Sequence, residues 1–404
     1  MLDLLLKTKM RTVPRKAVII ERETPFLGEM KDVEKFKVIL SDCHLSAGRH
    51  FEGRLNPHED FYFDDEMVDL IDHFSHGKYG ESASGPVEVE LILNGDYFDY
   101  LNVPVQGEFE DAITEEIALY KTEAILRGHP KVMSAIRRFA SLPGKKVTYL
   151  IGNHDADLFF EKVRERITRE WDPAGRYPSE KVQVYADRDR MVFEGGLEIR
   201  HGNQLEAGSE LDFKHPFLTQ DLERPLLQLP WGSFYVLKII NRLKWEREYI
   251  DKVRPVKLFV LFGLVMDPWF TLRFCFLSAF YFLKTRFIWS PKRRSNLKTT
   301  MEILRQETRF FLDLEAEARK LLDESPELKT VIFGHTHRPM FKVYPDGKQY
   351  INTGTWTKMI NLDWRGLGQQ FRRTFALVQI EDGVAQCELR QWMGEYRPHQ
   401  IFDG

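Results

Sequence analysis

Short apolar runs recur along the chain, and five of them end abruptly in polar residues. The runs lie at residues 38–40, 91–93, 149–151, 197–199 and 331–333. Apolar or alternating runs of this length, bounded by turn-forming residues, are typical of β-strands. The pattern therefore predicts five strands, each followed directly by a polar motif.

The side chains in these five motifs are of the kinds that bind divalent metals. The motifs are Asp42-Cys43-His44, Gly95-Asp96-Tyr97-Phe98-Asp99, Gly152-Asn153-His154-Asp155, His201-Gly202-Asn203 and Gly334-His335-Thr336-His337. Open α/β sheets bind their ligands at the carboxyl ends of the strands. One such motif would mean little, but five in this position predict a two-metal hydrolytic site.

Other segments alternate between helical and strand-like patterns. Helical spacing of apolar residues predicts helices over residues 63–73, 110–142, 158–171 and 299–323. The polar segment 46–62 is expected to be a loop at the site, because it contains several turn-forming residues. The end of the chain, 330–392, is predicted to be β-rich, with hairpin turns at 345–347 and 381–383.

Residues 206–295 differ from the rest of the chain. The stretch 256–289 is rich in Phe, Leu and Trp, and Lys and Arg residues crowd both of its edges. A spanning helix needs about 20 consecutive apolar residues, but Asp267-Pro268 interrupts the stretch earlier. We expect two helices that lie in a membrane interface, with their basic flanks near anionic headgroups. A buried helical hairpin and a dimer interface are the alternatives.

Length and composition narrow the class of protein. The 404 residues permit a core with an insertion, which we divide into residues 33–205, 206–295 and 296–392. A net charge of −3 gives no support for nucleic-acid binding. Three widely spaced cysteines and an N-terminal apolar stretch too short for a secretory signal predict a cytoplasmic protein. The apolar insertion would place it at the inner face of the membrane.

Phosphoester hydrolysis by two metals needs a carboxylate that both ions share. Asp96 is the candidate for this bridge. Asp42 and His44 are two residues apart, so on an extended chain both would point the same way, and His335 and His337 share this spacing.

The remaining motif residues have separate roles. Asn153 offers an amide oxygen, and His201 offers an imidazole nitrogen. Cys43 lies between two candidate ligands and should point away from the metals, so we expect it to pack in the core.

The order of the five motifs resembles the calcineurin-like metallophosphoesterase superfamily over residues 35–205 and 330–356. The resemblance implies a four-layer αββα sandwich, an α/β fold with two facing sheets, and a helical insertion as a lid. It implies that one metal is held by Asp42, His44, Asp96 and His337. The other metal would be held by Asp96, Asn153, His201 and His335. Mn²⁺ is the expected ion, with Fe or Zn²⁺ as alternatives.

The same resemblance assigns catalysis to His154, which would stabilise the phosphoryl transition state or protonate the leaving oxygen. Asp155 would orient the ring of His154. Asp99 would act behind the metal ligands.

Two motifs look like those of the branch that contains the UDP-diacylglucosamine pyrophosphatase of lipid A synthesis. They are Ser41-Asp42-Cys43-His44-Leu45 and Gly334-His335-Thr336-His337-Arg338-Pro339. The chain departs from that branch at His154, where the family has Arg, and at Asn203, where it has Asp. Because of these two departures, we carry over the chemistry and the general lipid preference of the branch but not its specific substrate. We expect cleavage of a lipid or lipid-linked phosphodiester or pyrophosphate by a metal-activated water. Acyl chains would contact Phe259 and Phe262, and a phosphate would contact Arg293 and Arg294, unless these two arginines form a solvated turn.

Two other functions stay open. One is a soluble phosphodiesterase or phosphatase on nucleotides or phosphoproteins, with the insertion as a dimer interface. The other is a scaffold without catalytic activity, which is disfavoured because every expected ligand is present.

Overall fold

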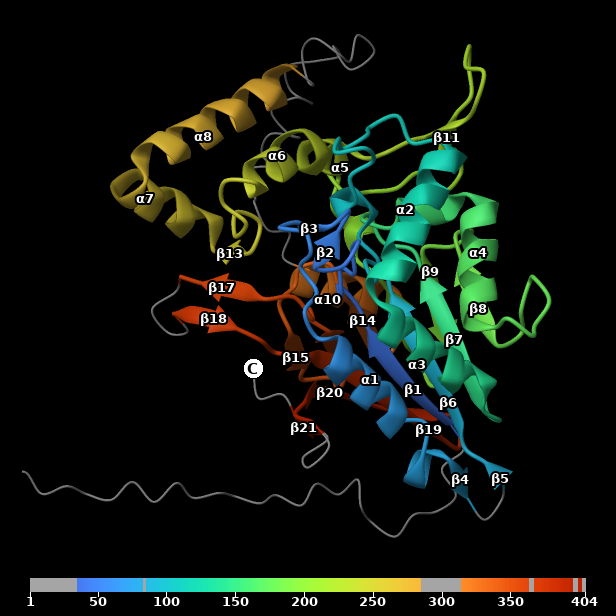
Figure 1. The fold of residues 1–404 in the computed structure, drawn as a ribbon. Coiled ribbons are helices and arrows are strands. Elements are labelled where there is room, and N and C mark those ends of the chain that lie inside the picture. The colour runs from blue at the N-terminus through green and yellow to red at the C-terminus, as the bar shows by residue number, and fades with distance from the viewer. Residues whose placement is uncertain (1–34, 83–84, 285–313, 363–366, 395–398, 402–404) are drawn as a thin grey trace, which may run out of the picture. The chain divides into compact units, whose positions relative to one another are not determined.

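Two β-sheets form the centre of the structure, a computed structural model (Figure 1). It describes residues 35–82, 85–284, 314–362, 367–394 and 399–401, which belong to one compact unit. The larger sheet has the order β21 (His399–Ile401), β20 (Val384–Trp392), β19 (Thr374–Glu381), β1 (Lys35–Leu40), β6 (Glu88–Asn94), β7 (Lys145–Leu150) and β8 (Val182–Tyr185). The smaller sheet has the order β15 (Met340–Val343), β16 (Gln349–Asn352), β14 (Thr330–Phe333), β10 (Leu197–Arg200) and β9 (Arg190–Phe193).

Within each sheet, the strands that precede the five motifs are parallel to one another. Strands β1, β6 and β7 lie side by side, with Leu40 opposite Leu93. Strands β10 and β14 form a parallel pair in the smaller sheet, with Ile199 opposite Ile332. Their carboxyl ends are therefore level, and the motifs that follow them can meet at one edge.

Apolar packing arranges the unit in four layers. Between the sheets, Ile39 and Ile92 of the larger sheet belong to the same cluster as Ile199 and Ile332 of the smaller one. The outer face of the larger sheet is covered by α1 (Asp64–His73), α2 (Glu115–Gly128), α3 (Pro130–Ser141) and α4 (Glu161–Trp171). The outer face of the smaller sheet packs against α10 (Leu314–Glu324). This arrangement confirms the predicted αββα order.

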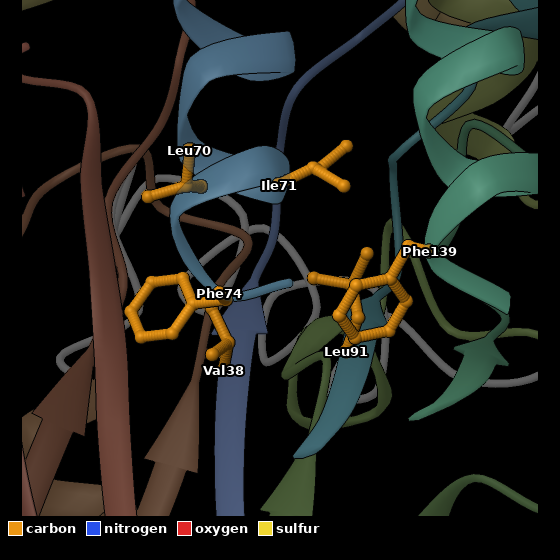
Figure 2. Close-up of a pocket in the computed structure, with 6 residues that line it drawn as sticks. All are labelled: Val38, Leu70, Ile71, Phe74, Leu91 and Phe139. Carbon is orange, nitrogen blue, oxygen red and sulfur yellow. The ribbon is translucent and has the colours of Figure 1, made fainter. Parts of the chain in front are cut away.

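The contact between α1 and the larger sheet is entirely apolar at its centre. Figure 2 shows Leu70 and Ile71 of α1, and Phe74 directly after α1, facing the strand residues Val38 and Leu91, with a ring from α3 beside them. The carboxyl end of α1 is thereby fixed on the sheet by side chains that have almost no contact with water.

Several short elements connect these layers. Four are small β-ribbons or sheets, namely β2 (His50–Phe51) with β3 (Arg54–Leu55), β4 (Glu81–Ser82) with β5 (Gly85–Pro86), β11 (Phe217–Leu218) with β12 (Leu226–Leu227), and β13 (Val253–Arg254) with β17 (Met359–Asn361) and β18 (Gly368–Gln370). Five are short helical turns, namely η2 (Gly77–Tyr79), η3 (Tyr100–Asn102), η4 (Ala156–Phe159), η5 (Asn203–Leu205) and η6 (Val236–Ile240).

Two helix predictions need correction or lie partly outside the described residues. The single helix expected over 110–142 is two helices, because Pro130 has no N–H to continue α2 and instead begins α3. Only the part of the 299–323 helix that belongs to α10 is described. Both expected hairpin turns are confirmed, between β15 and β16 and between β19 and β20.

The insertion has its own helices and its own small core. It contains α5 (Trp231–Tyr235), α6 (Asn241–Lys244), α7 (Val256–Met266) and α8 (Pro268–Leu283). Ile239, Ile240 and Leu243 pack with Phe270 and Phe274. As the sequence predicts, the apolar stretch breaks at Asp267, and α7 and α8 form a hairpin that is visible in Figure 1.

The hairpin exposes much of its apolar surface, which contradicts the alternative of a fully buried helical hairpin. No residue of α7 is buried. Met266 and Trp269 are each 83% exposed, Val265 is 76% exposed and Phe276 is 68% exposed. Among the described helices, none is long and apolar enough to cross a membrane.

Candidate metal centre

The five motifs meet where the carboxyl ends of the two sheets come together. Asn94 links the sheets, because its side chain donates to the Arg200 carbonyl at 2.9 Å and its carbonyl lies 2.8 Å from His201 Nδ1. The Gly334 N–H donates to the His201 carbonyl at 2.8 Å. The His335 N–H donates to the Asp42 carboxylate at 2.9 Å. The His154 N–H donates to Asp96 Oδ1 at 2.8 Å, so each motif is bonded to a segment that follows or ends another strand.

Backbone conformation, rather than strand alternation, aims the ligands inward. Asp42, His44, Asp96, His335 and His337 all have positive φ, between 51° and 69°. Residues other than glycine rarely adopt this conformation, and it is concentrated at functional sites. The expectation that Asp42 and His44 share a direction on an extended chain is therefore wrong in its reasoning, although both side chains reach the same place.

The first ligand group contains Asp42, His44 and His337, whose ligand atoms lie within 4.8 Å of one another. The Nε2 atoms of His44 and His337 are 2.9 Å apart, and His337 Nε2 is 3.4 Å from Asp42 Oδ1. The Nδ1 atom of His44 is 3.0 Å from Asp99, so the neutral ring carries its proton there and presents the Nε2 lone pair. Two such nitrogens and a carboxylate around one point suit a divalent cation.

The second ligand group contains Asp96, His201 and His335. In the described part of the chain, His201 is fully buried and its Nε2 lies 3.1 Å from Asp96 Oδ2. The side-chain oxygen of Asn153 is also buried and has no partner among those residues. A buried polar atom without a partner is costly, and a bound cation would supply one to this oxygen. The six predicted Asp and His ligands therefore fit two divalent metals, and Asp96 also groups with His44.

The motif glycines make room for these ligands. At Gly152 a β-carbon would collide with the carboxylate of Asp96, and at Gly334 it would collide with the side chains of Ser41 and Asp42. Any larger residue at either position would displace a carboxylate that the site needs.

The electrostatics keep the carboxylates charged. Burial raises the pKa of Asp96, but the imidazoles of His201 and His154 outweigh burial and hold that pKa well below its usual range. For His201 the effect of burial is the opposite, because burial lowers the pKa of an imidazole. The carboxylates of Asp96 and Asp42 outweigh burial and raise the pKa of His201 to about 10. In the centre without a cation, protonated imidazoles therefore balance the charge of the carboxylates, which is the charge that a divalent ion would balance when bound.

His154 lies beside the two groups, and its ring is held by a residue other than the predicted one. Its Nδ1 atom is 3.1 Å from Asp99 Oδ1, whereas Asp155 accepts from the Tyr149 hydroxyl at 2.7 Å and from the Tyr97 N–H at 3.3 Å. The prediction that Asp155 orients His154 is therefore wrong. Asp155 fixes the turn of its own motif, and Asp99 holds the rings of both His44 and His154.

Sequence reasoning missed one residue behind the second group. The Nε2 atom of His335 is 2.7 Å from Glu206, which directs the other ring nitrogen of His335 towards the site. Burial raises the pKa of Glu206, but His335 outweighs burial and lowers it to about 2. The sequence gives little indication of this role, because Glu206 stands at the boundary of the insertion and outside the five motifs.

The other predicted residues lie away from these contacts. Cys43 is fully buried in the core, which confirms its packing role. Phe259 packs on Phe274 within the hairpin, and Phe262 is 46% exposed on α7. Arg293 and Arg294 lie outside the described residues.

Comparisons with known proteins give low similarity. A predicted phosphoesterase from Streptococcus pneumoniae TIGR4 has 11% identity and a TM-score of 0.26, with 91% of this chain and 93% of that chain covered. A dimetal phosphatase from Danio rerio has 10% identity and a TM-score of 0.34, with 91% and 98% covered. The calcineurin-like phosphoesterase YfkN from Bacillus subtilis has 10% identity and a TM-score of 0.33, with 89% and 91% covered. No family model and no curated protein matches the chain.

Proposed function

We propose that this chain is a dimetal phosphoester hydrolase. The observation that carries the proposal is that Asp96 groups with His44 on one side and with His201 and His335 on the other. A carboxylate between two sets of imidazoles is what two closely spaced divalent cations require. Mn²⁺ is the proposed ion, because mixed Asp, His and Asn ligation suits it, with Fe or Zn²⁺ as alternatives.

The chain's own residues orient the His154 ring and supply a proton from it. Two bound divalent ions would activate a water and neutralise charge on the phosphoryl oxygens. In the proposed step the water oxygen bonds to phosphorus and one of its protons passes to solvent, while the bond to the leaving oxygen breaks and His154 Nε2 gives that oxygen a proton. Burial lowers the pKa of His154, but Asp99 and Asp96 outweigh it and raise the pKa to about 9. The ring therefore carries the proton at neutral pH.

The proposed substrate is a lipid or lipid-linked phosphodiester or pyrophosphate at the cytoplasmic face of a membrane. The exposed side of the α7–α8 hairpin supports this choice, because soluble monomers rarely expose so much contiguous apolar surface without a function. Trp269 and Met266 are suited to the boundary between headgroups and acyl chains. An apolar surface of this kind with no use would favour aggregation.

The hairpin is also connected to the metal centre. Strand β13 leads directly into α7 and pairs with β17, with Arg254 opposite Asn361. Shortly before β17, the Trp356 N–H donates to the Asp42 carbonyl at 3.3 Å, and the Thr355 hydroxyl donates to the same oxygen at 2.6 Å. This connection supports a model in which the hairpin enters the membrane surface while the headgroup reaches the metals.

The experiment compares two substrates with Mn²⁺ present, a soluble aryl phosphodiester and a diacyl lipid pyrophosphate in mixed micelles. The test variant changes the exposed hairpin residues Val265, Met266, Trp269 and Phe276 to Ser. The control variant changes Val192 and Val384 to Ser, because these are also exposed, at 59% and 50%, but lie on β9 and β20.

We expect the wild type and the control to prefer the lipid, and the hairpin variant to lose that preference while it still cleaves the soluble ester. Equal turnover of the soluble ester by all three proteins, with no lipid cleavage, would reject the lipid substrate and favour a soluble phosphodiesterase. No Mn²⁺-dependent cleavage of either substrate by the wild type would reject the hydrolase itself.

A further inference from the structure

A buried cluster of charges joins the insertion to the core. The carboxylate of Asp60, in the loop before α1, lies 2.7 Å from Lys244 Nζ and 2.6 Å from Lys252 Nζ. Lys244 Nζ also lies 2.8 Å from Asp251. The Lys244 side chain is fully buried and that of Lys252 is 7% exposed. Apolar residues of similar size often fill such a position without loss of stability, so a cluster of this kind calls for a further reason.

The cluster continues to the metal centre through one amide. The Asn102 side chain donates to Asp60 at 3.4 Å and to Asp99 Oδ2 at 2.8 Å. The Asn102 N–H also donates to Asp99 Oδ1 at 3.1 Å. The two oxygens of Asp99 are the ones that contact the Nδ1 atoms of His44 and His154. A continuous polar path therefore runs from the insertion to both rings.

A second contact from the insertion holds the same turn of the core. Asn241 of α6 donates from its side chain to the Leu101 carbonyl in η3 at 2.7 Å. Its own carbonyl lies 2.8 Å from His58 Nε2. The turn that carries Asn102 is thus bonded to α6 as well as to the Asp60 cluster.

We infer that the insertion positions the metal centre: Lys244 and Lys252 hold Asp60, and Asn102 passes this constraint to Asp99 and so to the rings of His44 and His154. This inference rests on the proposed function. Lys244, Lys252, Asp60 and Asn102 are positioning residues, because they touch neither the ligand groups nor the reacting atoms. Partners behind metal ligands set ring orientation and so metal affinity.

The test measures Mn²⁺ affinity by calorimetry, together with the thermal unfolding midpoint. Asn102→Ala cuts the path beside Asp99 and leaves Asp60 with both lysines. Lys244→Met cuts the path in the insertion. Lys238→Met is the matched control, because Lys238 pairs with Asp111 at 2.8 Å across the same boundary but outside the path.

We expect Asn102→Ala and Lys244→Met each to weaken one of two Mn²⁺ sites by about 10- to 100-fold, the usual effect of losing an outer partner. The double variant should bind no more weakly than Asn102→Ala alone, because both changes cut one path. Lys238→Met should bind Mn²⁺ like the wild type.

Wild-type affinity in Asn102→Ala would overturn the inference, even if Lys244→Met fails to fold. The inference would also be overturned if the loss of Mn²⁺ affinity in the double variant equalled the product of the two single losses, because the two residues would then contribute independently. A wild type that binds no Mn²⁺ would reject the proposed function and this inference with it, whereas unchanged variants beside a binding wild type reject the inference alone.

Discussion

Replacing His154 with Ala tests the division between ligands and catalytic residues. The ring is fixed by Asp99 at 3.1 Å and lies against the ring of His44, with centroids 4.7 Å apart. Its Nδ1 is occupied, so Nε2 is the only atom that can serve a leaving oxygen. Loss of a positioned acid lowers turnover by roughly 10²- to 10⁴-fold, which is about 3–5 kcal/mol of barrier. We expect that loss in His154→Ala with KM little changed.

The assay pairs turnover of a soluble phosphodiester with the number of Mn²⁺ ions bound in calorimetry. The pairing matters because His154 also groups with His44 and Asp96 within 4.8 Å, so the geometry alone would allow it to bind metal. His215→Ala is the control, because the His215 side chain is 78% exposed and outside the site.

Unchanged turnover in His154→Ala would remove this residue from the mechanism. A fall from two bound Mn²⁺ ions to one would make His154 a metal ligand and would refute its assignment as the acid. Two ions with turnover reduced over the expected range would support the acid role.

Three further predictions concern stability. Burial lowers the pKa of His129, but Glu59 and Asp64 outweigh it and raise the pKa from 6.5 to about 9. The protonated ring therefore contributes its full stabilisation, roughly 3 kcal/mol, below pH 6.5, and this stabilisation is lost as the pH rises through about 9. In urea unfolding, the free energy of unfolding of His129→Gln should differ most from that of the wild type at pH 6. An equal difference at pH 10 would contradict this prediction. Leu70→Ala should cost about 2–5 kcal/mol in the same assay, because it leaves a cavity under α1, and a loss below about 1 kcal/mol would show that the site collapses. Mn²⁺ at 100 times its Kd should stabilise the wild type by about 2.7 kcal/mol, and Asp96→Asn should abolish most of this shift, so an equal shift in both would place the metals elsewhere.

The local sequence determined the strands and the identity of the candidate ligands. Strands β1, β6 and β7 overlap the apolar runs at 38–40, 91–93 and 149–151 and begin three or four residues before them, because a strand buried on both faces needs a short apolar run bounded by turn residues. The seven candidate ligands follow the strands, because side chains that bind metals are recognisable by type. The insertion was visible for the same reason, since its composition differs from that of its neighbours.

Only the tertiary structure decided how these residues act. Asp99 rather than Asp155 holds His154, because the hydrogen-bond partner depends on which turns meet and not on distance along the chain. Glu206 contacts His335 across 129 positions. Five candidate ligands adopt positive φ, which strand alternation cannot predict. Local patterns fix which side chains are available, but their bonding partners come from distant segments that only the folded chain brings together.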